Sequence, residues 1–260
     1  MADDALLETT VHAAAAIVRI NRPDRANAIN SALSAHMVEQ LLLLDRDEEV
    51  RAIILTGAGD RHFCAGGDIK DMAAADARAR PRGPMDAGTR ALFEVVQELR
   101  KPVIAAINGV AAGGGFELAL SCDMRVADEH AIFSLPETRR GMGAHFASVM
   151  LPRMLPSAIA SEMLLTGAPM SAPDALRWGL LNRVTPKGGA LAAAIGLAAD
   201  VAKGAPVSVR RIKANAVRSP GLPLAAALRL DIGPNPYESE DRIEGLKAFL
   251  EKRDPVWRGR

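Results

Sequence analysis

Short apolar runs bounded by turn residues predict buried β-strands in three places. The runs cover residues 13–20, 51–56 and 103–107, and each ends at asparagine or glycine. Runs of this kind, with valine and isoleucine in them, are typical of strands that are covered on both faces. Between them, residues 31–44 and 89–100 have apolar positions at helical spacing. The chain therefore predicts an α/β fold.

Capping residues mark the ends of two predicted helices. A first pattern is Ser171 with Asp174 three residues on, which begins a short helix that Gly179 ends. A second cap, Ser31, precedes a helix whose apolar positions share one face: Leu33, Met37, Leu41 and Leu44.

The last part of the chain is helical without strands in between. Helices are expected over 191–202, 206–217, 222–230 and 239–252, and Pro206 suits the first position of its helix. Because these helices follow the strands instead of alternating with them, they predict a separate helical layer. We expect a core domain over residues 1–200 and a C-terminal helical region over 201–260.

The stretch 101–137 carries the clearest chemistry. The glycines 113–115 follow a predicted strand and precede good helix formers, which predicts a tight loop and then a helix N-terminus. Backbone N–H groups at such an end can hold a developing negative charge. Glu117 lies in the first helical turn, and Glu137 follows Pro136. A carboxylate in a first turn is also an ordinary partner of the helix dipole, so these residues alone leave a structural role open.

Composition and charge narrow the classes of function. The net charge of +1 argues against a nucleic-acid partner, which needs a basic stripe. Two cysteines, Cys64 and Cys122, make no disulfide framework and fit a reducing cytoplasm. The acidic N-terminus is unlike a signal peptide, and the apolar runs are too short to span a membrane. No metal-ligand or nucleotide-binding motif is found. We expect a soluble cytoplasmic protein without a metal.

One block of the sequence resembles a known family. Residues 104–109 and 113–115, with Leu120, Cys122 and Asp123, fit the signature of the enoyl-CoA hydratase/isomerase (crotonase) superfamily without a gap. The blocks 20–29, 57–69 and 164–184 follow the family's order, and the tail at 239–257 is similar to carnitinyl-CoA dehydratase-like members. The resemblance implies a crotonase-like spiral of strand–strand–helix repeats. It also implies a C-terminal helical oligomerisation layer that assembles a homotrimer or homohexamer.

The resemblance further implies a site for an acyl-CoA thioester. The N–H groups of Gly67 and Gly114 match the two donors of the family's oxyanion hole. Glu137 would exchange a proton at the alpha carbon and Glu117 would deprotonate water, although the two roles could be exchanged or shared. Coenzyme A would enter as part of the substrate, and no cofactor would be permanently bound. The positions matched to coenzyme A are Arg25, Ala26, Ala28, Ala65, Gly67, Asp68, Ile69, Lys70 and, from a neighbouring subunit, Lys252. An ordinary surface role remains open for the arginine and the two lysines.

Two segments depart from simple expectations. Residues 138–148 lack the family's usual proline and are one residue shorter than related sequences. His145 in this segment could contact a polar substrate, but a structural, hydrogen-bonded histidine is the interpretation we favour. Residues 71–88 mix alanine, arginine, proline and glycine, which predicts a loop near the acyl pocket that begins as helix.

Two carboxylates favour an enoyl-CoA hydratase or dehydratase, which adds or removes water across the 2,3 double bond of the thioester. A double-bond isomerase, which needs one acid–base carboxylate, is an alternative. So is a CoA-binding relative that has lost catalysis. A dehalogenase would need an aspartate nucleophile near His145, and none is found there.

Overall fold

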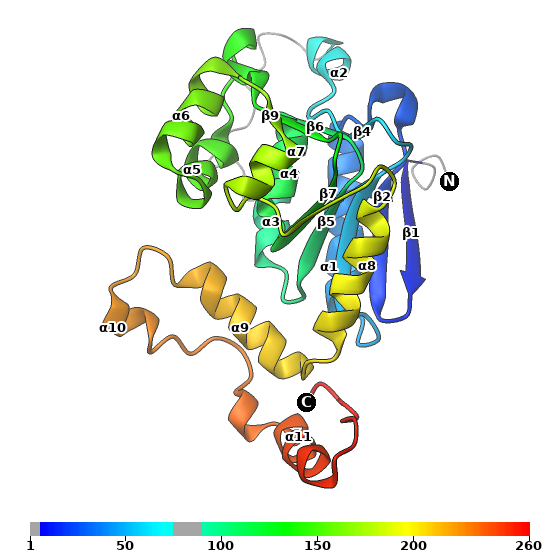
Figure 1. Ribbon diagram of the computed structural model, residues 1–260, viewed down its shortest axis with the longest axis vertical. Coiled ribbons are helices and arrows are strands. Elements are labelled where there is room, and N and C mark those ends of the chain that lie inside the picture. The colour runs from blue at the N-terminus through cyan, green and yellow to red at the C-terminus, as the bar shows by residue number, and fades with distance from the viewer. Residues whose placement is uncertain (1–5, 75–89) are drawn as a thin grey trace.

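Two β-sheets form the centre of the molecule in a computed structural model that describes residues 6–74 and 90–260 (Figure 1). In the larger sheet β1 is antiparallel to β2 and the other pairs are parallel. Its strand order is β1 (Leu7–His12), β2 (Ala15–Ile20), β3 (Ala52–Gly57), β5 (Val103–Ile107), β7 (Met124–Asp128), β10 (Arg183–Thr185). The smaller sheet is parallel except at its last pair. Its order is β4 (His62–Cys64), β6 (Val110–Ala112), β8 (Ile132–Ser134), β9 (Met170–Ser171).

The chain passes repeatedly from the larger sheet to the smaller one and then into a helix. β3 leads to β4 and α2 (Ile69–Ala74), and β5 leads to β6 and α4 (Gly114–Ser121). β7 leads in the same way to β8 and the 3-10 helix η2 (Pro136–Arg140). This pattern confirms the predicted spiral of strand–strand–helix repeats. Since β4, β6 and β8 are parallel neighbours, the residues that follow them meet at one edge of the smaller sheet.

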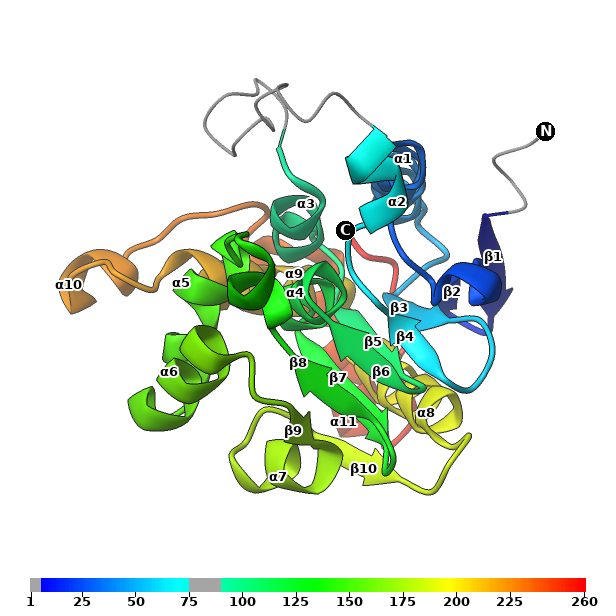
Figure 2. The same ribbon diagram turned by 90° about the horizontal axis from the view of Figure 1, so that it is seen from above.

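Helices cover both faces of the larger sheet. On β3, Ile53 and Leu55 pack into a core with α1 (Ser31–Arg46), α3 (Leu92–Glu98) and α4. Ile54, which lies between them, packs with Ala194 and Ala198 of α8 (Ala190–Ala202) on the opposite face (Figure 2). Alternate side chains of a strand point to opposite faces, so the whole of β3 is buried. This burial explains why apolar runs predicted the three strands correctly.

The remaining helices lie outside the strand–strand–helix repeats. They are α5 (His145–Met154), α6 (Ser157–Thr166), α7 (Ala172–Arg177), α9 (Pro206–Arg218), α10 (Leu224–Ala227) and α11 (Glu240–Glu251), with the 3-10 turns η1 (Pro23–Arg25) and η3 (Pro236–Glu238). Figure 1 shows α9, α10 and α11 reaching away from the sheets, whereas α8 lies along them. The helix predicted over 191–202 therefore belongs to the core and not to the C-terminal layer. The boundary at residue 200 stays a prediction.

Three local predictions are corrected. The cap of α1 is Asn30, whose side chain accepts the Leu33 N–H at 2.9 Å, and not Ser31. Strand β1 was not predicted, because it is an edge strand whose side chains after Leu7 are exposed and show no apolar run. The helix expected over 222–230 shortens to α10, which has four residues and none buried. A helix this short is not stable on helix propensity alone, and α10 has no packed face to stabilise it.

Two further observations concern the chain as a whole. The loop predicted over 71–88 begins inside α2, and residues 75–89 lie outside the described residues. In the part of the chain that is described, no single helix has the length and hydropathy of a membrane span. Only α8 and α9 taken together reach them, and the chain bends by 110° between the two helices.

Candidate active site

The glycine triplet brings α4 against two other segments. Gly113 has φ +55°, and a β-carbon on it would lie 2.7 Å from Glu137 Oε1. A β-carbon on Gly115 would lie 2.0 Å from the carbonyl oxygen of Cys64. Both positions therefore exclude side chains. At Gly113 the positive φ and the close contact exclude one, and at Gly115 the close contact alone does so. The triplet thus places the N-terminus of α4 between the loop after β4 and the segment after β8.

Glu117 projects from the first turn of α4 into a buried environment. Its residue is 7% exposed, and its Oε1 accepts the N–H of Ala147 in the first turn of α5 at 2.9 Å. Burial raises the pKa of this carboxyl, the Ala147 hydrogen bond opposes the rise, and the negative charge of Glu137 adds to it. One oxygen of Glu117 is therefore held in position, and the negative charge of Glu137 influences the pKa of the Glu117 carboxyl.

Glu137 lies in η2, directly after β8. It is 8% exposed, and its Oε2 is buried without a hydrogen-bond partner among the described residues. Burial raises the pKa of its carboxyl, against the opposing effects of its own backbone N–H and of Arg140. A buried oxygen without a partner is costly in a native protein and calls for an explanation such as a catalytic role. A carboxyl with a raised pKa can carry a proton that an ordinary glutamate would lose.

Two backbone N–H groups lie side by side near these carboxylates. A β-carbon on Gly114 would be 3.7 Å from the nitrogen of Gly67, and one on Gly66 would be 2.9 Å from the nitrogen of Gly114. Neither the Gly67 nor the Gly114 N–H has an acceptor among the described residues. The structure thus brings together the two donors that the sequence predicted. Paired donors of this kind can stabilise an oxyanion.

Most of the positions matched to coenzyme A also come together. The N–H of Ala65 donates to the carbonyl of Ala26 at 3.1 Å, and the Ile29 N–H donates to Gly66 at 2.8 Å. Ile29 in turn accepts the N–H of Asp68 at 3.0 Å. These bonds place residues 25–29 beside residues 65–70. The loops that precede α1 and α2 therefore form one continuous surface.

The side chains on this surface have different roles. Asp68 is buried, and its carboxylate pairs with Arg22 at 3.0 Å, so it fastens the two loops together. Burial alone would raise the pKa of Asp68, but hydrogen bonding to Arg22 and to backbone N–H groups outweighs it and lowers the pKa. Arg25, Ile69 and Lys70 are exposed, while Ala28 is buried. Neither of the two cations forms an ion pair with a described residue, so both could meet a ligand, and the aspartate is a structural element of the loop.

Lys252 does not join this group within one chain. It ends α11 with a left-handed φ of 55°. Figure 1 shows α11 at the opposite end of the molecule from α2. A contact between Lys252 and the loop surface therefore requires a second subunit.

His145 begins α5 and is exposed. Its ring forms no hydrogen bond within the described ranges, so the structural, hydrogen-bonded histidine that we favoured is not found. The ring lies close to Gly143, where a β-carbon would be 3.4 Å from its Cε1. Its charge is among the influences that lower the pKa of Glu117.

The sequence analysis did not identify two residues that contribute to the site. The Ala147 N–H holds Glu117, but a backbone donor leaves no mark in side-chain chemistry. Asn27 is fully buried, and its Nδ2 donates to the carbonyls of Ala58 and His62 at 3.0 and 2.7 Å. Its φ of 54° is in the left-handed region, which asparagine tolerates better than most residues. An asparagine in the middle of the motif at 20–29 was the available signal.

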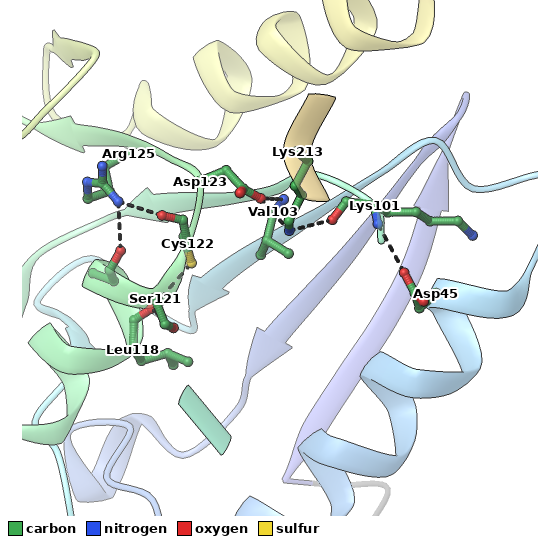
Figure 3. Close-up of polar contacts among 10 residues, drawn as sticks. Asp45, Lys101, Val103, Leu118, Ser121, Cys122, Asp123, Arg125 and Lys213 are labelled. Atoms are coloured by element: carbon green, nitrogen blue, oxygen red, sulfur yellow. Dashed lines mark hydrogen bonds and ion pairs between the residues drawn. The ribbon is translucent and has the colours of Figure 1, made fainter. Parts of the chain in front are cut away.

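The C-terminal end of α4 is fixed by three charged side chains (Figure 3). The guanidinium of Arg125 donates to the carbonyls of Cys122 and Leu180 at 2.6 and 2.8 Å. Asp123 Oδ2 accepts the Val103 N–H at 2.7 Å and pairs with Lys213 Nζ at 2.6 Å. Lys213 belongs to α9, so this pair joins the C-terminal helices to the helix that carries Glu117.

Known proteins are similar to this chain in sequence and in fold. The profile of the family described as enoyl-CoA hydratase/isomerase matches residues 10–260. The carnitinyl-CoA dehydratase of Citrobacter koseri is 41% identical over 98% of both chains, and that of Salmonella typhimurium is 42% identical over 94% of both. Among solved structures, the enoyl-CoA hydratase from Bacillus anthracis has a TM-score of 0.90 and 32% identity, over 98% of this chain and 100% of that chain. The enoyl-CoA hydratase from Mycobacterium tuberculosis has a TM-score of 0.88 and 34% identity over the same shares.

Proposed function

The chain belongs to the enoyl-CoA hydratase/isomerase family and is a hydratase or dehydratase of CoA thioesters, and we propose that Glu117 and Glu137 perform its chemistry. The family and the hydro-lyase activity agree with what the sequence predicted. The observation that carries our assignment is the meeting of two buried carboxylates with two backbone donors that have no acceptor among the described residues, at one edge of the smaller sheet.

The thioester carbonyl oxygen would lie between the N–H groups of Gly67 and Gly114. Negative charge develops on this oxygen when the double bond is attacked and an enolate forms. Fixed donors stabilise that charge without reorganising, and removal of one donor of this kind typically costs about 3 kcal/mol of barrier. No side chain is needed for this task, which is consistent with glycine at both positions.

The two glutamates divide the proton transfers. In hydration, ionised Glu117 takes a proton from a water molecule while the oxygen of that water bonds to the β-carbon. Protonated Glu137 gives a proton to the α-carbon. Transfer of the proton from Glu117 back to Glu137 restores the starting state. Dehydration runs the same steps in reverse. The Ala147 hydrogen bond favours the ionised form of Glu117 and leaves its other oxygen for water, whereas no described residue hydrogen-bonds to Oε2 of Glu137.

Binding of the coenzyme A portion would use the surface formed by residues 25–29 and 65–70. Arg25 and Lys70 would meet its phosphates, and Lys252 would arrive from a neighbouring subunit. Support for assembly comes from large apolar side chains that are exposed on the C-terminal helices: Ile212, Leu224, Leu228, Ile243, Phe249 and Leu250. Exposed groups of this size mark interfaces, and a homotrimer or homohexamer would cover them.

A hydration assay tests the reaction directly. Loss of the conjugated-enoyl absorbance of crotonyl-CoA would be followed with purified protein, and products of a panel of acyl-CoA thioesters, carnitinyl-CoA included, would be identified by mass spectrometry. We expect addition or removal of water on at least one member of the panel. Double-bond migration on 3-enoyl-CoA without any hydration would contradict the proposal.

A further inference from the structure

A hollow separate from the candidate active site lies between the end of α1, the start of β5, the first turn of α9 and the C-terminal segment. It contains none of the residues assigned to the active site. Figure 1 shows the C-terminus beside the junction of α8 and α9, at the opposite end of the molecule from α2. Three acidic residues line the hollow, Asp45, Asp47 and Glu48. Six basic residues line it as well: Arg46, Arg51, Arg100, Lys101, Arg210 and Arg258.

Two of the basic residues are already engaged at the acidic wall. Asp45 accepts Nε of Arg100 at 2.8 Å and the backbone N–H of Lys101 at 3.0 Å. The ammonium of Lys101 donates to the carbonyls of Leu44 and Asp47, at the C-terminal end of α1. Cations at a helix C-terminus offset the negative end of its dipole. Arg100 and Lys101 are therefore occupied in holding α1.

The opposite wall carries three arginines, and the nearby Asp241 carboxylate accepts the backbone N–H groups of Arg258 and Gly259 at 2.7 and 2.9 Å. Arg51 is half-buried, and its guanidinium makes no hydrogen bond or ion pair with any described residue. Arg210 is also half-buried, and within the described ranges its guanidinium donates only to the carbonyls of Pro206 and Gly259. Burial lowers the pKa of Arg210 and the charges of Arg100 and Arg51 lower it further, while the charges of Asp45 and Asp241 oppose this change. Arg258 stands nearby and pairs with Glu240 at 3.6 Å. Positive charge is thus concentrated on one side of the hollow.

Gly259 leaves open the space in front of the two half-buried guanidiniums. A β-carbon on it would lie 3.4 Å from Arg51 Nη1 and 3.7 Å from Arg210 Nη2. Its φ of 75° also disfavours any other residue. Two arginine side chains therefore converge on the position that a β-carbon at residue 259 would occupy.

We propose that this hollow binds a phosphate-bearing anion between Arg51 and Arg210. Guanidinium groups match the oxygen geometry of phosphate and can each donate two hydrogen bonds. An anion there would neutralise two half-buried charges and would join the core strand β3, the first turn of α9 and the C-terminal segment. The site is independent of the acyl-CoA surface and of the proposed reaction.

Isothermal titration calorimetry with inorganic phosphate tests the proposal, using the full chain and an ionic strength held constant with sodium chloride. We expect saturable binding of one phosphate per chain. Arg51→Gln and Arg210→Gln should each weaken it by about tenfold or more, because each removes charge-assisted hydrogen bonds. Arg51→Lys should retain part of the affinity. Turnover of acyl-CoA by Arg51→Gln should equal that of the wild type.

Matched controls separate this site from the acyl-CoA surface. Arg61→Gln removes an exposed arginine outside the hollow, and Arg25→Gln removes one from the predicted coenzyme A loop. Both should bind phosphate as the wild type does. Adenosine monophosphate in a parallel titration distinguishes free phosphate from a phosphate ester as the source of the anion, and either result agrees with the proposal if Arg51→Gln weakens it.

Three outcomes would overturn the inference. One is wild-type protein without saturable phosphate binding. A second is binding that survives both Arg51→Gln and Arg210→Gln but is lost in Arg25→Gln, which would place the anion on the acyl-CoA surface. The third is a change of assembled mass in Arg51→Gln with unchanged phosphate affinity, which would make the hollow a contact between subunits. If Arg51→Gln does not fold, Arg210→Gln and Arg51→Lys still decide between these results.

Discussion

At the scale of single residues, the two glutamates differ in what their carboxylates touch. Glu117 is held by the Ala147 N–H, whereas one oxygen of Glu137 is buried without a partner among the described residues. A restrained carboxylate suits the positioning of water, and an unpaired one suits direct proton exchange with substrate. This difference is the structural reason for giving water to Glu117 and the α-carbon to Glu137.

Replacing each glutamate by glutamine tests the division of roles. Glutamine keeps the shape but cannot take a proton, so Glu117→Gln and Glu137→Gln should each lower kcat by about 10²–10⁴-fold. The double variant should lose less than the product of the two, because groups that act as a unit are non-additive. Rates would be measured on an enoyl-CoA and on a 3-enoyl-CoA. An isomerase would instead retain double-bond migration in Glu117→Gln, and full hydration by that variant would rule out our assignment.

The same substitutions should affect stability in a pH-dependent way. Burial raises the folded-state pKa of both carboxyls above the ordinary 4.5, so the folded protein binds these protons more tightly than the unfolded chain does. Their contribution to stability is complete below about pH 4.5 and is lost as pH rises through the raised values. Glu137→Gln does not titrate, so its unfolding midpoint relative to wild type should rise between pH 4.5 and 8. Glu39→Gln, on the exposed side of α1, is the control. A difference that is independent of pH would contradict the argument.

At the scale of elements, the active site depends on how the ends of short strands meet. The strands β4, β6 and β8 are parallel neighbours, so Gly67, Gly114 and Glu137 come together although 137 and 67 are far apart in sequence. These residues could be picked out in the sequence, because each follows an apolar run or a glycine motif. Their meeting was predictable only through the family resemblance.

Other parts of the site and fold had no readable pattern. The Ala147 donor is a backbone group, the edge strand β1 has exposed side chains, and α10 has no buried face. By contrast, the strands with both faces buried and the helix cap at Ser171 were predicted correctly, since each has a local cause. Local chemistry thus fixes elements, and contacts between distant segments complete the site.

The ion pair between Asp123 and Lys213 gives the element scale a test. The Lys213 side chain is 7% exposed and that of Asp123 is 24% exposed. Removal of one partner from a buried pair costs about 3–5 kcal/mol, and partial exposure of Asp123 places Lys213→Met at the lower end of this range. The free energy of unfolding would be measured by urea denaturation at fixed protein concentration.

Two controls make that measurement specific. Lys203→Met removes an exposed lysine that pairs with Asp200, and it should leave the unfolding midpoint unchanged. Adding Asp123→Asn to Lys213→Met should recover part of the lost stability, because it removes the uncompensated charge. Equal effects of Lys213→Met and Lys203→Met would show that the pair does not anchor α9.

At the scale of the whole molecule, the C-terminal helices present apolar side chains to solvent, and α11 lies at the opposite end of its own chain from α2 (Figure 1). Phe249 and Leu250 on α11 are 82% and 80% exposed, and Lys252 ends the same helix. A neighbouring subunit would cover the two apolar groups and would bring Lys252 to a second active site. Assembly and ligand binding should therefore be lost together.

Mixed subunits test this connection. Lys252→Ala alone should raise KM for the acyl-CoA with little change in kcat, since the lysine would bind the cofactor and take no part in the proton transfers. Glu137→Gln subunits are inactive but still supply Lys252. Unfolding and refolding the two variants together should therefore create sites with an intact Glu137 and a neighbour's Lys252, and a fraction of the activity should return to the wild-type KM. Lys247→Ala, an exposed lysine on the same helix, should show neither effect. Light scattering of the same samples should show a trimer or hexamer; a monomer of 27.5 kDa, or a mixture in which all activity keeps the raised KM, would contradict the shared site.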